Sequence, residues 1–236
     1  MSVTKPLPRR RGGTYWLDAV EYDSVTTALG AISKPALEFY KRKRQFLRIC
    51  EDPEKWLGGT FEDLEAAARA ELDKAGDRGS TIHSLAEALD AGGEVDVTAV
   101  PTQFQGYVHA LIRFERDMKP LTLHTEATVF NTQYRYAGTL DRTCELGART
   151  VLLERKTTKY VYDEAIMQVA AYRHCDLLLT KDVPPERLPL PKIEAAAILL
   201  LREDGTYLFQ EIRADEEDLK DFLGALRLYR RGKAKV

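Results

Sequence analysis

Tyr136-Ala-Gly-Thr-Leu-Asp141 and Val151-Leu-Leu-Glu154-Arg-Lys156 are the two segments that say most about how this chain folds. The apolar run that opens the second segment is typical of a buried strand. Side chains alternate between the faces of a strand, so Glu154 and Lys156 emerge on one face and Arg155 on the other. Burying charge is unfavourable unless the charge is paired or binds a metal. Taken alone, the pair is most simply an ion pair at a strand end.

Asp141 changes this interpretation, because it ends a strand that lies ten residues before Val151. If the two strands are neighbours, Asp141 and Glu154 converge. Mg²⁺ takes one or two protein carboxylates and completes its octahedron with water and phosphate oxygens. Such an ion acidifies an attacking water, and Lys156 is placed to orient that water or stabilise developing charge. Gly138 either allows close approach of backbone or substrate or marks a β-bulge.

The pattern around these segments predicts an α/β sandwich on a mixed central sheet. Helical periodicity and capping signals predict helices over 24–40 with a restart at Pro35, 60–74, 81–93, 101–118, 162–179 and 215–229. Alternating or apolar β-forming runs predict strands over 122–131, 134–143, 150–156, 193–201 and 206–212. Thr132-Gln133 has the spacing of a hairpin turn, and the proline-rich stretch 183–191 is expected to be a loop.

Three motifs in this order resemble those of the PD-(D/E)xK nuclease superfamily. They are Gly138-Thr-Leu-Asp141, Glu154-Arg-Lys156-Thr157-Thr158 and Gln168-Val-Ala-Ala-Tyr172, and their order matches the RecB-like exonuclease branch. Arg78-Gly-Ser-Thr-Ile-His83 is similar to the histidine motif of that branch. The opening, from Tyr22 to Leu37, resembles bacteriophage exonucleases of this type. The resemblance covers about residues 20 to 212. Each motif is weak alone, and the ordered set is specific.

The resemblance implies a restriction-endonuclease-like core with helices flanking the sheet, and a metal-dependent deoxyribonuclease activity. It implies that His83, Asp141 and Glu154 hold Mg²⁺ or Mn²⁺ together with the backbone carbonyl of Arg155, and that Lys156 is the catalytic lysine. A histidine in a mainly oxygen shell suits Mn²⁺ beside Mg²⁺.

Several of these residues have a plainer interpretation. His83 lies one residue off the apolar stripe of its helix, where a histidine more often packs or faces solvent. Gln168 and Tyr172 are four residues apart and share a helix face, so they either contact substrate or form a polar edge over a core. Glu126 is a further carboxylate, expected to support the site.

The three cysteines, Cys50, Cys144 and Cys175, lie far apart and form no C-x-x-C pair. This spacing favours neither a disulfide framework nor a zinc site, so buried thiols that pack as small apolar groups are expected. Some RecB-like exonucleases carry four cysteines that bind an iron–sulfur cluster. The present set departs from that pattern, so we predict no cluster.

A net charge of −2 conceals local basic clusters. Lys41-Arg42-Lys43-Arg44 with Arg48 is the first candidate for a DNA path, and the run from Arg227 to Lys235 is the second. Because the protein as a whole is not basic, contact with DNA phosphates would have to come from such local patches. The alternative is that they are solvated helix faces, which is how most charge runs behave.

No run approaches the ~18 apolar residues of a membrane span, and the basic start has no apolar core of a secretory signal. We therefore expect a cytoplasmic protein of a bacterial or phage-infected cell that binds DNA and no membrane. A homo-oligomer, or a complex with a recombination or replication protein, stays open. The chain 1–236 is predicted to be one nuclease domain, with a basic arm (1–20), a helical portion carrying His83 (21–118) and an α/β catalytic core (119–236).

The first functional hypothesis is an exonuclease that acts on DNA ends in phage replication, recombination or repair. An endonuclease on the same fold is the nearest alternative, and it would show symmetric dimerisation or a base-reading element. A catalytically inactive DNA-binding or assembly subunit is the third. The complete set Asp141, Glu154 and Lys156 argues against this last hypothesis.

Overall fold

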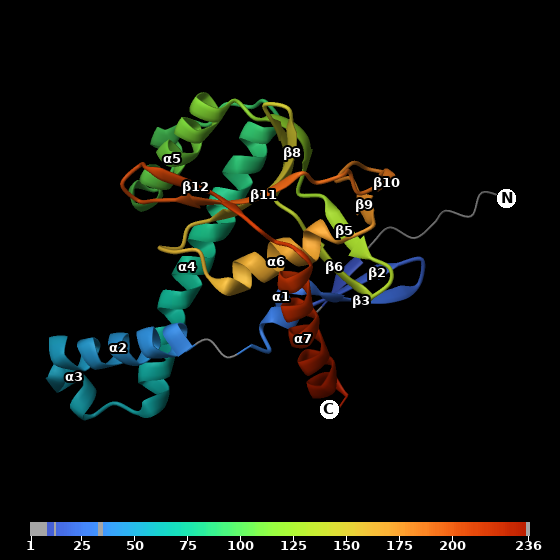
Figure 1. Ribbon diagram of the computed structural model, residues 1–236. Coiled ribbons are helices and arrows are strands. Elements are labelled where there is room, and N and C mark those ends of the chain that lie inside the picture. The colour runs from blue at the N-terminus through green and yellow to red at the C-terminus, as the bar shows by residue number, and fades with distance from the viewer. Residues whose placement is uncertain (1–8, 12, 33–34, 235–236) are drawn as a thin grey trace. The chain divides into compact units, whose positions relative to one another are not determined.

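The structure is a computed structural model that describes residues 9–11, 13–32 and 35–234 (Figure 1). The chain divides into two compact units. The first, here called the α/β unit, comprises Met1–Ala31 and Ile82–Val236, and the second, the helical unit, comprises Ile32–Thr81. The α/β class predicted from the sequence is confirmed. No helix of the described residues is long and apolar enough to cross a bilayer.

The helices are α1 (Val25–Leu29), α2 (Pro35–Glu51), α3 (Pro53–Leu57), α4 (Phe61–Asp90), α5 (Thr102–Met118), α6 (Asp163–Arg173) and α7 (Glu216–Lys233), with a 3₁₀ turn over Val97–Ala99. The strands are β1 (Arg9–Arg11), β2 (Thr14–Leu17), β3 (Val20–Ser24), β4 (Leu121–Thr125), β5 (Thr128–Asn131), β6 (Tyr136–Thr139), β7 (Arg142–Leu146), β8 (Arg149–Lys156), β9 (Leu177–Leu179), β10 (Arg187–Pro189), β11 (Ala195–Leu201) and β12 (Tyr207–Ile212).

Two mixed sheets replace the single central sheet expected from the sequence. A seven-stranded sheet has the order β1-β2-β3-β6-β5-β9-β10, and a five-stranded sheet has the order β12-β11-β8-β7-β4. Among the strands of the described residues, only β3 with β6 and β8 with β11 pair in parallel. The basic arm predicted for residues 1–20 contributes β1 and β2 to the larger sheet, and its residues 1–8 and 12 lie outside the described residues.

One long hairpin passes from one sheet to the other. Its β5 and β6 belong to the seven-stranded sheet, and its β4 and β7 to the five-stranded sheet. Backbone hydrogen bonds from Glu126 N–H to the Asp141 carbonyl (3.0 Å) and from Leu140 N–H to the Ala127 carbonyl (3.0 Å) keep the ladder in register across the change. Glu126 has a φ of +48°, an unusual backbone conformation for a side chain of this size, and the chain bends there.

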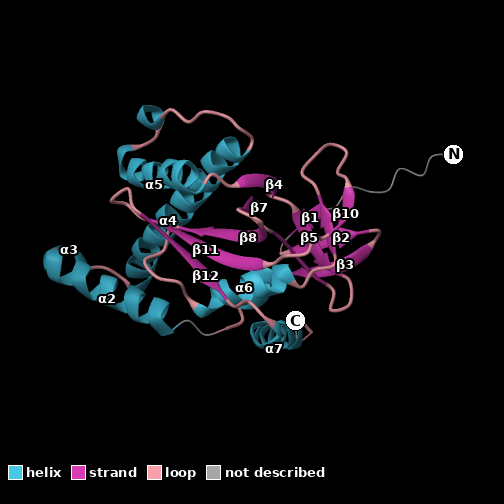
Figure 2. Ribbon diagram, turned by 45° about the horizontal axis from the view of Figure 1, so that its top comes forward, coloured by secondary structure: helices cyan, strands magenta, loops and turns pink. Residues whose placement is uncertain are grey.

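Packing on both faces of the five-stranded sheet fixes the elements that carry the candidate site. One face packs Val151, Leu153 and alternate residues of β11 against α5 and the end of α4. The opposite face is covered by α6, and Figure 2 shows α5 and α6 on opposite sides of this sheet. Burial on both faces explains why all seven residues of β11 are apolar and buried.

Several predicted elements differ from the structure. The two helices expected over 60–74 and 81–93 form one helix, α4, because strong helix formers on both sides outweigh the roughly 1 kcal/mol penalty of each internal glycine. The helix expected over 162–179 ends at Arg173. Three residues later, Asp176 accepts hydrogen bonds from the N–H (2.7 Å) and the hydroxyl (2.8 Å) of Thr132, and the chain continues directly into β9. The hairpin turn is longer than two residues, with an Arg135 N–H to Asn131 carbonyl bond of 2.9 Å. The stretch 183–191 contains β10.

Candidate metal centre

Three potential metal ligands meet at the bend of the long hairpin. His83 comes from α4, and Glu126 and Asp141 face each other where the hairpin changes sheet. One ligand atom from each lies within 4.8 Å of the others. The His83 Nδ1 atom is 3.4 Å from Asp141 Oδ1 and 3.8 Å from Glu126 Oε1. Glu126, expected from the sequence only to support the site, is thus one of its central members.

Asp141 is held rigidly by the strand beside it. Its Oδ2 atom accepts a 2.6 Å hydrogen bond from the backbone N–H of Arg155, and the carboxylate is buried. This bond leaves Oδ1 directed at His83. It also brings Asp141 next to Glu154, since β7 and β8 are antiparallel neighbours. The two strands are neighbours, which was the condition for Asp141 and Glu154 to converge, and the backbone N–H of Arg155 joins them at the site. Glu154 contributes no atom to the group of three described ligand residues within 4.8 Å.

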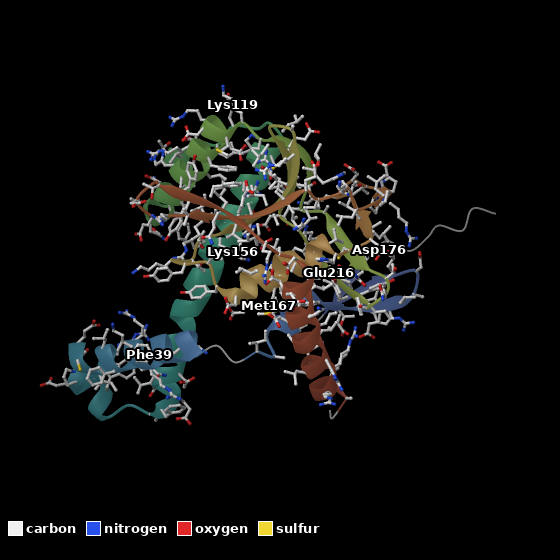
Figure 3. All side chains as sticks on the ribbon, in the orientation of Figure 1. Phe39, Lys119, Lys156, Met167, Asp176 and Glu216 are labelled. Carbon is white, nitrogen blue, oxygen red and sulfur yellow. The ribbon has the colours of Figure 1, made fainter. Side chains whose placement is uncertain are left out.

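A second group of polar side chains surrounds Glu154. Its Oε1 atom accepts hydrogen bonds from Lys156 Nζ (2.7 Å) and Gln168 Nε2 (2.7 Å). The Gln168 Oε1 atom accepts from Lys156 (3.0 Å), so the three side chains form a closed triangle. Gln168 also donates to the Tyr172 hydroxyl (3.1 Å). In Figure 3, Lys156 lies near α6, the helix that carries the labelled Met167 and, one residue later, Gln168.

Two carboxylate oxygens at this site are buried without a hydrogen-bond partner among the described residues. They are Glu126 Oε1 and Glu154 Oε2. Unsatisfied buried acceptors are rare, and a bound cation or water would satisfy these two oxygens. One imidazole with hard carboxylate oxygens is a donor set that suits Mn²⁺ and Mg²⁺. The residues present therefore fit a divalent cation.

The charges of the site are consistent with this donor set. Burial and then the Asp141 carboxylate raise the pKa of Glu154 to about 7, against the lowering effect of Lys156 and His83. The Glu126 carboxylate is the main cause that raises the pKa of His83, and burial opposes it. Burial disfavours the charged form of Lys156, but Glu154 and Asp141 outweigh this effect and raise its pKa. Bound positive charge would relieve the excess of negative charge.

Gly138 makes room for Tyr172 rather than forming a bulge. It pairs regularly with Val129 in the ladder of β5 and β6. A Cβ atom at this position would lie 2.3 Å from the Tyr172 Cε1 atom. Tyr172 is only 2% exposed and lies behind Gln168, so in this structure its ring is covered. The close approach expected at Gly138 is therefore that of a side chain of this protein.

Asp90 is a residue of this region that sequence reasoning missed. The Arg155 side chain leaves the site on the opposite face of β8 and binds both carboxylate oxygens of Asp90 at 2.6 Å. Arg142, which follows Asp141, also contacts Asp90 (3.0 Å), and both arginines are buried. Asp90 lies seven residues after His83 on α4, two turns along the same face. That spacing was the available signal.

The basic runs predicted to contact DNA belong to elements that carry none of the candidate metal ligands. Lys41, Arg42, Lys43 and Arg44 belong to α2 in the helical unit, so their role stays a prediction. In the C-terminal cluster, Arg230 pairs with Asp23 (2.7 Å), and Lys233 pairs with Glu21 and Asp23. These two cations are partly neutralised, whereas Arg227 and Arg231 are exposed on α7.

The cysteines agree with the sequence in part. Cys144 and Cys175 are buried as expected, and Cys50 is exposed, contrary to that expectation.

No family model matches the chain, and no curated protein matches it.

Proposed function

We propose that the α/β unit is a divalent-metal-dependent nuclease that hydrolyses phosphodiester bonds of DNA. The observation that supports it most is the meeting of His83, Glu126 and Asp141 at one point, beside a buried Glu154 with an unpartnered oxygen. The ordered motifs that resemble the RecB-like branch supply the substrate class. They also favour an exonuclease that acts at DNA ends, in phage replication, recombination or repair.

In this proposal His83, Glu126, Asp141 and Glu154 hold Mg²⁺ or Mn²⁺. The bound ion would lower the pKa of a water molecule and neutralise charge on the scissile phosphate. The Arg155 N–H keeps one oxygen of Asp141 occupied, so that its other oxygen stays available as a ligand. A ligand role for the Arg155 carbonyl comes from the resemblance alone.

Lys156 is the residue we assign to the attacking water and the developing negative charge. Glu154 and Gln168 hold its ammonium by hydrogen bonds of 2.7 and 3.0 Å, and its raised pKa keeps it charged. Such a preorganised charge stabilises a transition state without further reorganisation. Gln168, held between Glu154 and the buried Tyr172, keeps the ammonium in place.

The test compares end-labelled linear DNA with closed circular DNA in Mg²⁺, Mn²⁺ and EDTA. The proposal expects the linear substrate to be shortened from its ends, the circle to survive, and both to remain intact in EDTA or with Asp141→Ala or Glu154→Ala. Calorimetric titration should show Mn²⁺ binding that the double substitution removes. Cleavage of the circle would identify an endonuclease, and undiminished Mn²⁺ binding by the double variant would refute the metal site.

A further inference from the structure

The loop between β8 and α6 presents two exposed aromatic rings just beyond Lys156. Tyr160 is 57% exposed and Tyr162 is 42% exposed. They are the most exposed Phe, Tyr or Trp side chains among the described residues of the α/β unit. Their centroids lie 6.4 Å apart, edge to face at 90°. Neither ring belongs to a core of the unit, so packing of the fold does not account for them.

The backbone of this loop is fixed at several points. The Thr158 hydroxyl donates to the Tyr160 carbonyl at 3.0 Å. The Tyr162 carbonyl accepts from the Ala165 N–H at 2.9 Å, so Tyr162 begins the first turn of α6. The rings are therefore carried by a segment held between the strand that bears Lys156 and the helix that bears Gln168.

Chain geometry keeps the rings near the candidate metal centre. Tyr160 follows Lys156 by four residues, and four residues span at most about 14 Å between Cα atoms. Tyr162 precedes Gln168 by six residues, about 9 Å of helix rise. A DNA strand whose scissile phosphate lies at Lys156 would therefore carry its bases to these rings within a few nucleotides.

The chemistry around the rings favours stacking over charge as the source of affinity. The Lys159 ammonium lies 5.3 Å from the Tyr160 ring centroid and can contact a backbone phosphate. Asp163 and Glu164, in the first turn of α6, carry negative charge that opposes phosphate binding. Aromatic rings bind any base through its face, but only where that base is unpaired or terminal.

We propose that Tyr160 and Tyr162 form a stacking platform for unpaired bases at the end of a DNA strand, which makes a single-stranded end the preferred substrate. This inference rests on the proposed nuclease function, because that function places the scissile phosphate at Lys156. The platform engages bases next to the cleaved bond and sets strand preference without taking part in the chemistry.

The test measures binding of a fluorescent single-stranded thymidine oligonucleotide by anisotropy, in Ca²⁺ and again in EDTA. Tyr160→Ala with Tyr162→Ala should weaken binding about 5- to 100-fold for each stacked base lost. The matched pair Tyr160→Phe with Tyr162→Phe keeps both rings and should bind within about 2-fold of the wild type. Trp16→Ala, at an exposed aromatic side chain of β2, should leave binding unchanged.

A relaxed, covalently closed circular duplex offers no strand end and no unpaired base, so its affinity should be the same for all variants. Unchanged single-strand affinity of the alanine pair would overturn the platform, and so would a phenylalanine pair as weak as the alanine pair. Failure of the nuclease proposal is separately visible. Ring-dependent binding by a protein that cleaves no DNA in Mg²⁺ or Mn²⁺ would support the platform and refute the nuclease.

Discussion

At the scale of single residues, Glu154 is a carboxyl group in surroundings that disfavour its charge. Its pKa rises from 4.5 to about 7, chiefly through burial and then through Asp141. A carboxyl with a higher pKa in the folded chain takes up a proton on folding, so stability falls as the pH rises from about 4.5 to about 7. His83, whose pKa is also raised, contributes stability below pH 6.5 that is lost as the pH rises through its folded value.

The metal-free protein should therefore be less stable at pH 8 than at pH 5 through this site, by on the order of 1–3 kcal/mol. Asp141→Asn removes one cause of the shift and can still accept the Arg155 hydrogen bond, so its stability should fall less. Urea denaturation in EDTA at both pH values measures the difference between the two proteins. An equal pH dependence would contradict the assigned cause.

Lys156→Ala should separate metal binding from catalysis. An ammonium cannot ligate a cation, so Mn²⁺ affinity should be largely retained. The single-turnover cleavage rate should fall by about 10²-fold or more, the usual effect of losing one preorganised charge or donor. Lys156→Arg should also be slow, since a planar guanidinium does not replace a compact ammonium. If Lys156→Ala cleaved DNA at the wild-type rate, the catalytic role assigned to Lys156 would be wrong.

Gly138→Ala tests the contact with Tyr172. The added Cβ atom would lie 2.3 Å from the ring, so the ring must move, at a cost of about 1–3 kcal/mol. Thermal or urea denaturation measures the loss. The matched control is Gly224→Ala in α7, where a Cβ atom meets nothing within 4 Å and helix propensity should raise stability slightly. Adding Tyr172→Leu to Gly138→Ala should restore part of the lost stability. A Gly138→Ala variant as stable as the wild type would contradict the contact with Tyr172.

At the scale of elements, Asp90 connects the helix that carries His83 to the two strands that carry Asp141 and Glu154. Removing one partner of a buried ion pair leaves uncompensated charge and costs about 3–5 kcal/mol. Asp90→Asn should therefore destabilise the α/β unit strongly, whereas Asp117→Asn, at the partly exposed Arg116 pair, should change stability by under about 1 kcal/mol. Denaturation of both variants checks this, and comparable small losses would show that Asp90 does not hold these elements together.

The sequence predicted local elements better than their assembly. Strand alternation placed Glu154 and Lys156 on one face, and the hairpin partners 122–131 and 134–143 pair as predicted, with one register shift between Thr122 and His124. The division of that hairpin between two sheets depends on a left-handed residue at Glu126, which no periodicity reveals. Glu126 lies beside Asp141, 15 residues away in the sequence, and Asp90 pairs with Arg155, 65 residues away. Local sequence patterns do not encode such contacts.

At the scale of the whole molecule, the candidate chemistry and the clearest basic run belong to different compact units. The motif residues from His83 to Tyr172 lie in the α/β unit, and Lys41 to Arg44 lie in the helical unit. On α7, acidic partners partly neutralise Arg230 and Lys233. Among the basic runs singled out from the sequence, the exposed cations Arg42 and Lys43 of α2 and the pair Arg227 and Arg231 of α7 are the candidates for phosphate affinity.

Charge reversal decides between these two sources. Arg42 and Lys43 are exposed, so Arg42→Glu with Lys43→Glu should remove phosphate contacts without disturbing a core. Each lost contact lowers the slope of log affinity against log salt by about 0.7 for single strands and 0.9 for duplex DNA, so the pair should lower it by roughly 1.4 to 1.8. Cleavage at saturating substrate should persist, because the metal ligands and Lys156 are unchanged. Arg227→Glu with Arg231→Glu is the matched variant on α7. If only that variant flattens the salt dependence, DNA crosses α7. If neither does, affinity comes from contacts other than these charges, and the stacking loop beyond Lys156 becomes its main source.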